Sequence, residues 1–327
     1  MTLASRPAAG LPSVVHLVRR NTPLAVFERF LESYRRNEAG VEHRFVLLCK
    51  GFSSAAELAP VLERLDGLRA ERIDVPDDGY DLTAYRVAAA ALTPSRCCFL
   101  NSYSTILAAN WLAHLHAALE LPGVGLVGAS GSWGSHRSFA RFALGLGGPY
   151  ARVYADRRAT TATFDSIGAG GDEPQPSPSS PPPRRNRFAS HRELAFAVYQ
   201  QFHGFSPFPA PHVRSTGFML DAASAVALLG LPLATKFDTY RAESGAASVS
   251  ARVERSGSRL LVVDRDGNSH GAEDWPDSRT FWQGEQEQLM IADKQTDSYS
   301  MGNDEQRLAL SRFAWGSRAD SARAGAH

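Results

Sequence analysis

Charged and small polar side chains follow several apolar runs of this sequence, and they are the groups best able to carry chemistry. They occur at Arg19-Arg20-Asn21, Asp77-Asp78, Asn101-Ser102 and Asp264-Arg265-Asp266. If the apolar runs are neighbouring parallel strands, these ends share one edge of a sheet. Arginines, carboxylates and hydroxyls together suit a charged, oxygen-rich ligand such as a nucleotide diphosphate. A single strand end of this kind is most often a solvated loop, but several on one edge favour a binding site.

The stretch from Arg96 to Ser104 is the clearest example. The apolar run Cys97-Cys98-Phe99-Leu100 stops abruptly at Asn101, Ser102 and Ser104. A helix-like pattern follows, which predicts a helix over residues 104–120. A buried strand that presents polar groups at its carboxyl end is the way in which open α/β sheets place their chemistry.

Alternating strands and helices must position these groups. Apolar runs predict strands at 14–18, 44–48, 72–75, 97–100, 124–127, 214–220 and 260–263. Between them, apolar spacing near 3.6 residues predicts helices at 23–36, 53–65, 81–92, 104–120, 191–201 and 221–229, and a polar helix opens at 237–245. This alternation predicts an α/β fold with a mostly parallel central sheet flanked by helices.

Composition narrows the class of protein. The chain has 327 residues, 43% of them hydrophobic, and its 35 basic and 34 acidic residues leave a net charge of +1. This balance does not point to a nucleic-acid partner. Cys49, Cys97 and Cys98 are interpreted as reduced, buried thiols. Neither a signal peptide nor a membrane-spanning run is recognised, so we expect a cytoplasmic protein that is soluble or peripheral at the inner membrane.

Two segments outside the sheet have distinct compositions. Residues 168–187 are rich in glycine, proline and serine, which predicts a flexible insertion. Residues 137–187 are locally basic, which favours an anionic or membrane-borne partner. The formal G-x-G-x-x-G match at 123–128 is rejected as a dinucleotide site, because its glycines bracket a predicted strand.

Taken in order, these motifs resemble nucleotide-sugar glycosyltransferases of the GT-A fold, closest to the family-2 type. Asp77-Asp78-Gly79-Tyr80-Asp81 occupies the family's turn before a small-residue helix, and Phe99-Leu100-Asn101-Ser102-Tyr103 occupies its Asp-x-Asp strand end. Ser215-Thr216-Gly217 resembles the acceptor-side segment, and Ala242-Glu243-Ser244 stands at the acidic x-Glu-Asp motif. The resemblance covers about 14–128 and 212–270. It implies a GT-A-like (Rossmann-like) domain over 1–270, followed at 271–327 by a helical or irregular extension with a disordered tail.

The resemblance also implies roles for particular residues. The donor-binding set that it implies comprises Arg19, Asp78, Asp81, Arg86, Asn101, Ser102, Tyr103 and Gly217. His270 lies where many members carry a histidine that helps to bind a metal. The donor would be a nucleotide sugar, with Mg²⁺ or Mn²⁺ as the metal. The partner would be a glycan or lipid-linked acceptor in bacterial cell-surface polysaccharide assembly.

The chain departs from the family pattern at two places. Asn101 and Tyr103 are neutral and are poorer ligands for a hard divalent ion than carboxylates. Either Asp81 or His270 holds the metal, or no metal is needed and an arginine such as Arg86 neutralises the leaving group. Where the family has Asp-Asp-Gly-Ser after the second strand, this chain has Cys49-Lys50-Gly51-Phe52.

Glu243 is the leading candidate for the catalytic base, and Asp238 is the second. We expect both acids to precede or open a helix, where a carboxylate is favoured in any case. Two other functions stay open from the residues. One is a non-catalytic GT-A-like scaffold that binds a nucleotide or glycan, which the neutral Asn-Ser-Tyr motif favours. The other is a nucleotidyltransferase, which would want a glycine-rich phosphate loop near the first strand.

Overall fold

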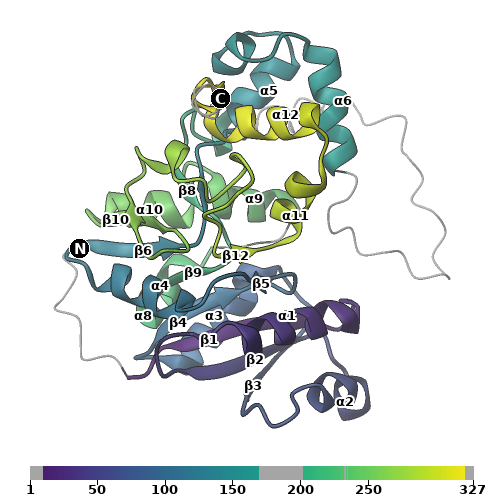
Figure 1. Ribbon diagram of the computed structural model, residues 1–327, viewed down its shortest axis with the longest axis vertical. Coiled ribbons are helices and arrows are strands. Elements are labelled where there is room, and N and C mark those ends of the chain that lie inside the picture. The colour runs from purple at the N-terminus through teal and green to yellow at the C-terminus, as the bar shows by residue number, and fades with distance from the viewer. Residues whose placement is uncertain (1–9, 169–201, 232, 234, 321–327) are drawn as a thin grey trace.

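The computed structural model describes residues 10–168, 202–231, 233 and 235–320. Within them, an eight-stranded sheet forms the centre of the molecule (Figure 1). Its strands, in spatial order, are β11 (Ser269–His270), β10 (Arg259–Val263), β6 (Val124–Gly128), β9 (Phe218–Asp221), β4 (Arg96–Leu100), β1 (Ser13–Arg19), β2 (Arg44–Lys50) and β3 (Glu71–Val75). Strands β3, β2, β1 and β4 are mutually parallel, and β10 is parallel to β6. The antiparallel strand β9 joins β4 to β6, and β11 is antiparallel to β10. The predicted α/β class with a mostly parallel sheet is confirmed.

Helices cover both faces of this sheet, and α5, α6 and α12 pack on one another at one end of the molecule (Figure 1). The helices of the described residues are α1 (Leu24–Arg36), α2 (Ala55–Glu63), α3 (Asp81–Leu92), α4 (Trp111–Glu120), α5 (His136–Ala143), α6 (Arg157–Gly168), α8 (Ala222–Leu228), α9 (Lys236–Ser244), α10 (Val249–Arg255), α11 (Lys294–Met301) and α12 (Asp304–Trp315), with short 3₁₀ turns at Pro149–Arg152 and Trp275–Asp277. None of the helices in the described parts of the chain combines the length and apolar character needed to cross a membrane.

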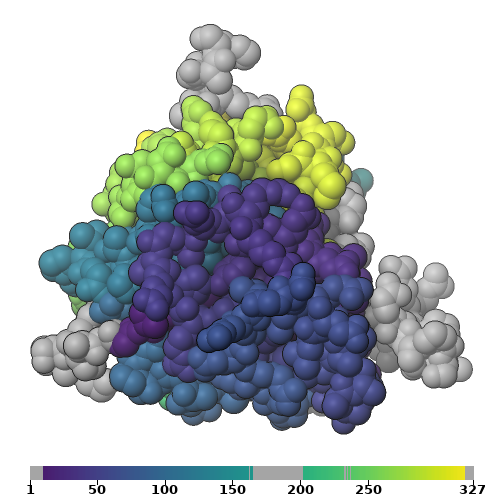
Figure 2. Space-filling view, turned by 60° about the horizontal axis from the view of Figure 1, so that its bottom comes forward, coloured from purple at the N-terminus to yellow at the C-terminus, as the bar shows by residue number. Residues whose placement is uncertain are grey.

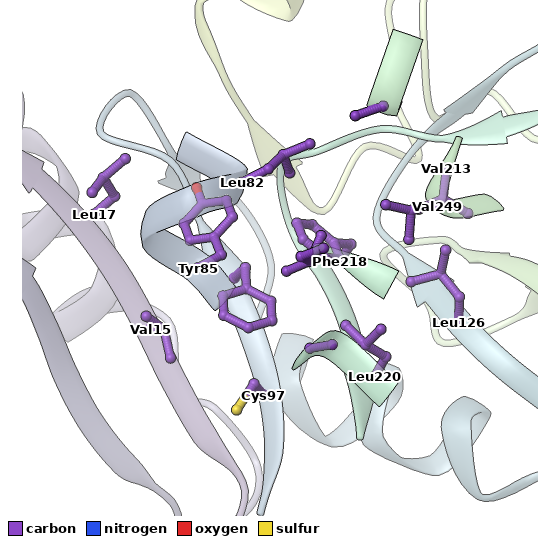
Figure 3. Close-up of a cluster of buried hydrophobic side chains, with 14 of the residues drawn as sticks. Val15, Leu17, Leu82, Tyr85, Cys97, Leu126, Val213, Phe218, Leu220 and Val249 are labelled. Carbon is purple, nitrogen blue, oxygen red and sulfur yellow. The ribbon is translucent and has the colours of Figure 1, made fainter. Parts of the chain in front are cut away.

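The central strands are apolar on both faces because both faces are buried. Along β1, Val15 and Leu17 belong to the cluster beneath α3 and α8, whereas Val14 and Val18 belong to the cluster beneath α1 and α4. Successive strand residues point to opposite faces, so apolar residues on both faces of one strand contribute to two cores. Figure 3 shows the first of these clusters, including Val15, Leu17 and Tyr85. The three cysteines are free and buried, as expected.

Helix α3 spans Asp81–Leu92, which confirms the predicted helix over 81–92. Asp81 lies in the first turn, where a carboxylate stabilises the exposed N–H groups. Ala88 and Ala89 are fully buried, because their small side chains allow the helix to approach the sheet closely. The helix ends before Pro94, which disfavours helical backbone in the preceding residue. Asp81 is thereby fixed at the edge where β1 ends.

The predicted helix over 104–120 is wrong in its first part. Thr105–Ile106 forms β5, which pairs antiparallel with β12 (Ile291–Ala292), and α4 begins only at Trp111. Asn110, directly before α4, has a left-handed backbone with φ of 59°, and its N–H donates to the Glu38 carbonyl at 2.7 Å. The backbone groups that the helix would need therefore bond to distant segments instead.

The predicted strand over 214–220 also begins later than expected. It divides into β8 (His212–Val213), which pairs with β7 (Gly131–Ser132), and β9, which starts at Phe218. Between them, Gly217 adopts φ of 64°, a left-handed conformation that strand residues do not use. The polar residues 214–216 thus lie in a connection between two strands.

The C-terminal segment contacts both the core and the N-terminal half. Trp275 and Trp315 belong to the cluster beneath α3, and Ile291 belongs to the cluster beneath α1. Arg29 of α1 lies 3.9 Å from Asp297 of α11. In Figure 2 the C-terminal residues, coloured green to yellow, form a layer beside the purple N-terminal ones. The predicted helix at 191–201, the predicted tail and all but the first residue of the 168–187 insertion lie outside the described residues.

Candidate active site

A small pocket lies on the sheet face that α3 and α10 cover, beside the connection between β8 and β9. Three polar residues line this pocket, namely Arg214, Ser215 and Glu243. The remaining lining is apolar and comes from Leu82, Leu126, Val213, Phe218 and Val249. Figure 3 shows these five apolar side chains from different elements gathered on one face of the sheet. A mostly apolar pocket with a few polar groups is typical of sites for small ligands.

Glu243 is the acid of this pocket. Ser215 donates its hydroxyl to Glu243 Oε1 at 2.5 Å. The pKa of Glu243 is raised to about 7, chiefly by burial. The carboxylates of Asp81 and Asp293 act in the same direction, whereas the hydrogen bond from Ser215 and the charge of Arg214 oppose the rise. A carboxyl group with a pKa near 7 can take up and release a proton at physiological pH.

The position of Glu243 in its helix differs from the expectation. Glu243 is the second-last residue of α9, whereas Asp238 lies in the first turn. The expectation that Glu243 opens a helix is therefore wrong, because α9 already begins at Lys236. The C-terminal end of a helix carries partial negative charge, which disfavours a carboxylate and acts in the same direction as burial. The position of Glu243 in its helix therefore favours the protonated form of its carboxyl group.

Arg214 and Asp293 form a nearly buried ion pair beside the pocket. Arg214 Nη2 lies 2.7 Å from Asp293 Oδ2 and donates to Gln295 Oε1 at 2.9 Å. The guanidinium also lies 4.3 Å from the centre of the Phe281 ring. Although burial acts to raise it, the pKa of Asp293 stays below its usual range because of Arg214 and hydrogen bonds from Thr296 and Thr216. The position of Arg214 is therefore fixed by residues of the C-terminal segment, which are distant from it in the sequence.

The turn after β4 is held by the side chain of Asn101. Its Oδ1 accepts from the Tyr103 N–H at 2.9 Å and from the Ser104 hydroxyl at 3.3 Å, and its Nδ2 donates to Thr216 Oγ1 at 2.5 Å. Ser102 is buried in the same turn, and its hydroxyl has no partner among the described residues. These bonds link the turn to the residues before β9.

Arg19 and Asp81 meet at the adjacent strand end. Arg19 Nε donates to Asp81 Oδ1 at 3.0 Å, and a second guanidinium nitrogen contacts the same oxygen. Because β1 and β4 pair in parallel with His16 opposite Leu100, Arg19 and Asn101 emerge at the same edge of the sheet. Lys50, at the end of β2, is buried and donates to the Gly79 carbonyl at 2.7 Å. Burial lowers the pKa of Lys50.

The structure thus brings together Arg19, Asp81, Asn101, Ser102 and Tyr103 at the strand ends, with Glu243 in the adjoining pocket. Gly217 lies between these groups, and a Cβ placed on it would approach Ile291 Cδ1 to 2.9 Å.

Four other residues expected at the site do not share these hydrogen bonds or line the pocket. Asp78 is exposed in the loop after β3. Arg86 is exposed on α3 and donates to the Val226 carbonyl of α8 at 3.3 Å. Asp238 forms a capping box with Thr235. His270 lies 2.9 Å from Asp264, on a strand that β10, β6 and β9 separate from β4.

Two residues at the site were not expected from the sequence, namely Arg214 and Asp293. Asp293 caps α11 together with Thr296, so an Asp-x-x-Thr capping pattern could have marked this helix start. The contact between Asp293 and Arg214 has no local signal, because the two residues are far apart in the sequence.

Comparison with known proteins finds distant structural similarities. No family model and no curated protein matches the chain. Core-mannan synthase A from Aspergillus fumigatus, in its Mn/GDP form, aligns over 73% of this chain and 66% of its own, with 9% identity and a TM-score of 0.35. Glucosyl-3-phosphoglycerate synthase from Mycobacterium tuberculosis, in complex with Mn²⁺, UDP and phosphoglyceric acid, aligns over 39% of this chain and 49% of its own, with 18% identity and a TM-score of 0.26. UTP-bound UGPase from Acinetobacter baumannii aligns over 40% of this chain and 60% of its own, with 12% identity and a TM-score of 0.28. The chain spans less than two thirds of each of these proteins, and at such TM-scores the functional argument rests on the site residues themselves.

Proposed function

We propose that this chain is a glycosyltransferase that moves a sugar from a nucleotide-sugar donor to a hydroxyl group of a glycan or lipid-linked acceptor. Its role would be in bacterial cell-surface polysaccharide assembly, in the cytoplasm or peripherally at the inner membrane. The observation that carries this proposal is Glu243, a pocket acid whose pKa is about 7 and whose carboxyl is oriented by Ser215. The resemblance of the motif order to GT-A glycosyltransferases supplies the substrate class.

The proposed reaction requires one side chain that accepts the proton of the acceptor hydroxyl. In an inverting transfer, the acceptor oxygen forms a bond to the anomeric carbon while the bond from that carbon to the diphosphate oxygen breaks. The electron pair leaves with the diphosphate, and the acceptor proton passes to Glu243. A pKa near 7 leaves a substantial fraction of Glu243 ionised at neutral pH and still basic enough to accept that proton. The apolar lining of the pocket limits competition by water.

The strand ends provide the donor side of the same site. The Arg19–Asp81 pair and the turn at Asn101 emerge beside each other at the carboxyl edge of β1 and β4. Ligands of open α/β sheets bind at such an edge. We assign the nucleotide diphosphate to this edge and the acceptor to the pocket beneath Ser215.

A donor screen tests this function. The chain is incubated with a panel of nucleotide sugars, and both its melting temperature and the mass of the donor are followed. We expect one donor to raise the melting temperature and to be hydrolysed slowly. Glu243→Gln should keep the thermal response and lose roughly 100-fold or more of the turnover, which is the usual scale for a removed proton acceptor. Turnover by Glu243→Gln at the wild-type rate would refute the assigned base.

A non-catalytic scaffold is the second candidate, and the neutral Asn101 and Tyr103 favour it. The same screen separates the two functions. A donor that stabilises the protein without being consumed, in the presence of any acceptor tried, would favour the scaffold. Failure of every donor to bind would remove the nucleotide-sugar proposal.

A further inference from the structure

The turn over residues 101–104, where the resembling family places two metal-binding carboxylates, contains no carboxylate, and the amide of its Asn101 is already used in hydrogen bonds. A backbone N–H can donate only to an oxygen, so the bond from the Tyr103 N–H fixes the orientation of the Asn101 amide. With Oδ1 accepting twice and Nδ2 donating to Thr216, the amide is committed to the turn.

The acids nearby do not supply a replacement. No three histidine, cysteine, aspartate or glutamate side chains of the described residues converge on one point. Asp81 is paired with Arg19, Asp293 with Arg214, and His270 with Asp264. Mg²⁺ and Mn²⁺ prefer several anionic oxygens that are free to coordinate. The residues present at this site therefore do not fit a divalent metal.

A positive side chain stands at the turn instead. The Lys294 ammonium lies 5.6 Å from the centre of the Tyr103 ring. Lys294 is exposed, and no acidic side chain of the described chain lies within ion-pair distance of it. Its neighbour Asp293 is already neutralised by Arg214. The charge of Lys294 is thus available to a ligand, and an ammonium group is a common binder of phosphate.

Ser102 adds a second observation that points to an anion. It is 4% exposed, and its hydroxyl has no hydrogen-bond partner among the residues that the structure describes. A buried hydroxyl without a partner is costly unless a ligand or water satisfies it. A hydroxyl can donate to a phosphate oxygen. Ser102 belongs to the turn after β4, and Lys294, the first residue of α11, lies over Tyr103 of the same turn.

Resting on the function proposed above, we propose that this turn binds the donor diphosphate directly, with Lys294 supplying the positive charge that a divalent metal supplies elsewhere. The ammonium would neutralise the diphosphate as it leaves, which lowers the energy of the transition state. Donor binding in this chain therefore requires no Mg²⁺ or Mn²⁺.

The test measures nucleotide binding with and without metal. UDP, GDP, ADP, CDP and dTDP are titrated calorimetrically into the full chain, first with EDTA and then with Mn²⁺. We expect one diphosphate to bind in EDTA with an affinity that Mn²⁺ does not improve. Lys294→Gln should weaken that binding roughly tenfold or more, which corresponds to about 1.4 kcal/mol, because it removes the charge that attracts the diphosphate. Lys294→Arg should keep most of it.

The control variant is Arg36→Gln. Arg36 is 68% exposed at the end of α1 that lies away from the strand ends, so the variant removes one positive charge without touching the site. Its nucleotide affinity should match that of the wild type. All three variants change exposed side chains, and unchanged melting temperatures would show that they fold.

The outcomes separate this inference from the proposed function. Binding that appears only with Mn²⁺ would overturn the inference and leave the glycosyltransferase proposal standing. Binding in EDTA that Lys294→Gln leaves unchanged would also overturn it. If no diphosphate binds under either condition, both proposals fall.

Discussion

Replacement of Glu243 by glutamine should make the protein more stable at high pH, even though it removes a hydrogen-bonded acid. The pKa of Glu243 rises from its ordinary 4.5 to about 7, chiefly through burial. The folded protein therefore holds this proton more tightly than the unfolded chain does. The stabilisation that this provides is complete below about pH 4.5 and is lost as the pH rises through about 7. Glutamine, which is isosteric and uncharged, imitates the protonated acid at every pH.

The size of the effect follows from the two pKa values. The difference between 4.5 and about 7 corresponds to roughly 3 kcal/mol, at about 1.36 kcal/mol for each pH unit. Most of this, about 2.5 kcal/mol, develops between about pH 5 and about pH 8. The free energy of unfolding of Glu243→Gln, relative to that of the wild type, should therefore rise by about this amount between the two pH values. Other titrating groups are common to both proteins and cancel.

Urea denaturation at the two pH values measures the difference. Asp238→Asn is the matched control, because it removes an acid of the same helix that serves in a capping box. That variant should lose about 1 kcal/mol at both pH values. A stability difference between Glu243→Gln and wild type that does not change with pH would refute the raised pKa, and with it the physical basis for Glu243 as the base. The wild-type transfer rate should also rise with pH through about 7, because only the ionised acid accepts a proton.

Three further predictions concern the groups around Glu243. Arg214→Met should lower the free energy of unfolding, measured in urea, by about 3 kcal/mol or more, because it leaves the Asp293 carboxylate buried without its partner. Adding Asp293→Asn should restore part of the loss. An unchanged free energy of unfolding for Arg214→Met would contradict the role of this pair. Gly217→Ala should cost more stability than Gly257→Ala, since both have positive φ but only Gly217 is crowded, and equal thermal shifts would exclude crowding as the cause. Arg19→Gln should change the free energy of unfolding by less than about 1 kcal/mol, because its ion pair is partly exposed. It should nevertheless weaken binding of the nucleotide that the wild type prefers by roughly tenfold. Unchanged affinity in the same calorimetric titration would place the diphosphate elsewhere.

The sequence predicts the sheet well because its strands are buried on both faces. Runs such as Phe45 to Cys49 have no polar interruption, and such runs in a chain of alternating strands and helices indicate parallel strands. The same reasoning places Arg19 and Asn101 on one edge, which the register of β1 and β4 bears out.

Local patterns were less informative where distant segments decide the backbone. The apolar residues after Ser104 have helical spacing, but residues 105–106 pair with β12 instead. The position of Glu243 at the end of α9 depends on where the helix starts, and the capping box at Thr235 and Asp238 sets that start. The capping residues Thr235 and Asp238 can be recognised in the sequence. The strand that pairs with residues 105–106 cannot, because it comes from a segment that the resemblance does not cover.

The pairing of β5 with β12 has a consequence for the order in which the site forms during synthesis. Asn101 leaves the ribosome early, but the strand that pairs beside its turn, together with Asp293 and Lys294, follows only after most of the chain. A nascent chain that stops before residue 291 lacks Asp293, the ion-pair partner of Arg214. If the proposed diphosphate site is correct, donor recognition begins only after the C-terminal segment has folded back onto the first half, and nucleotide binding would then report on completed folding.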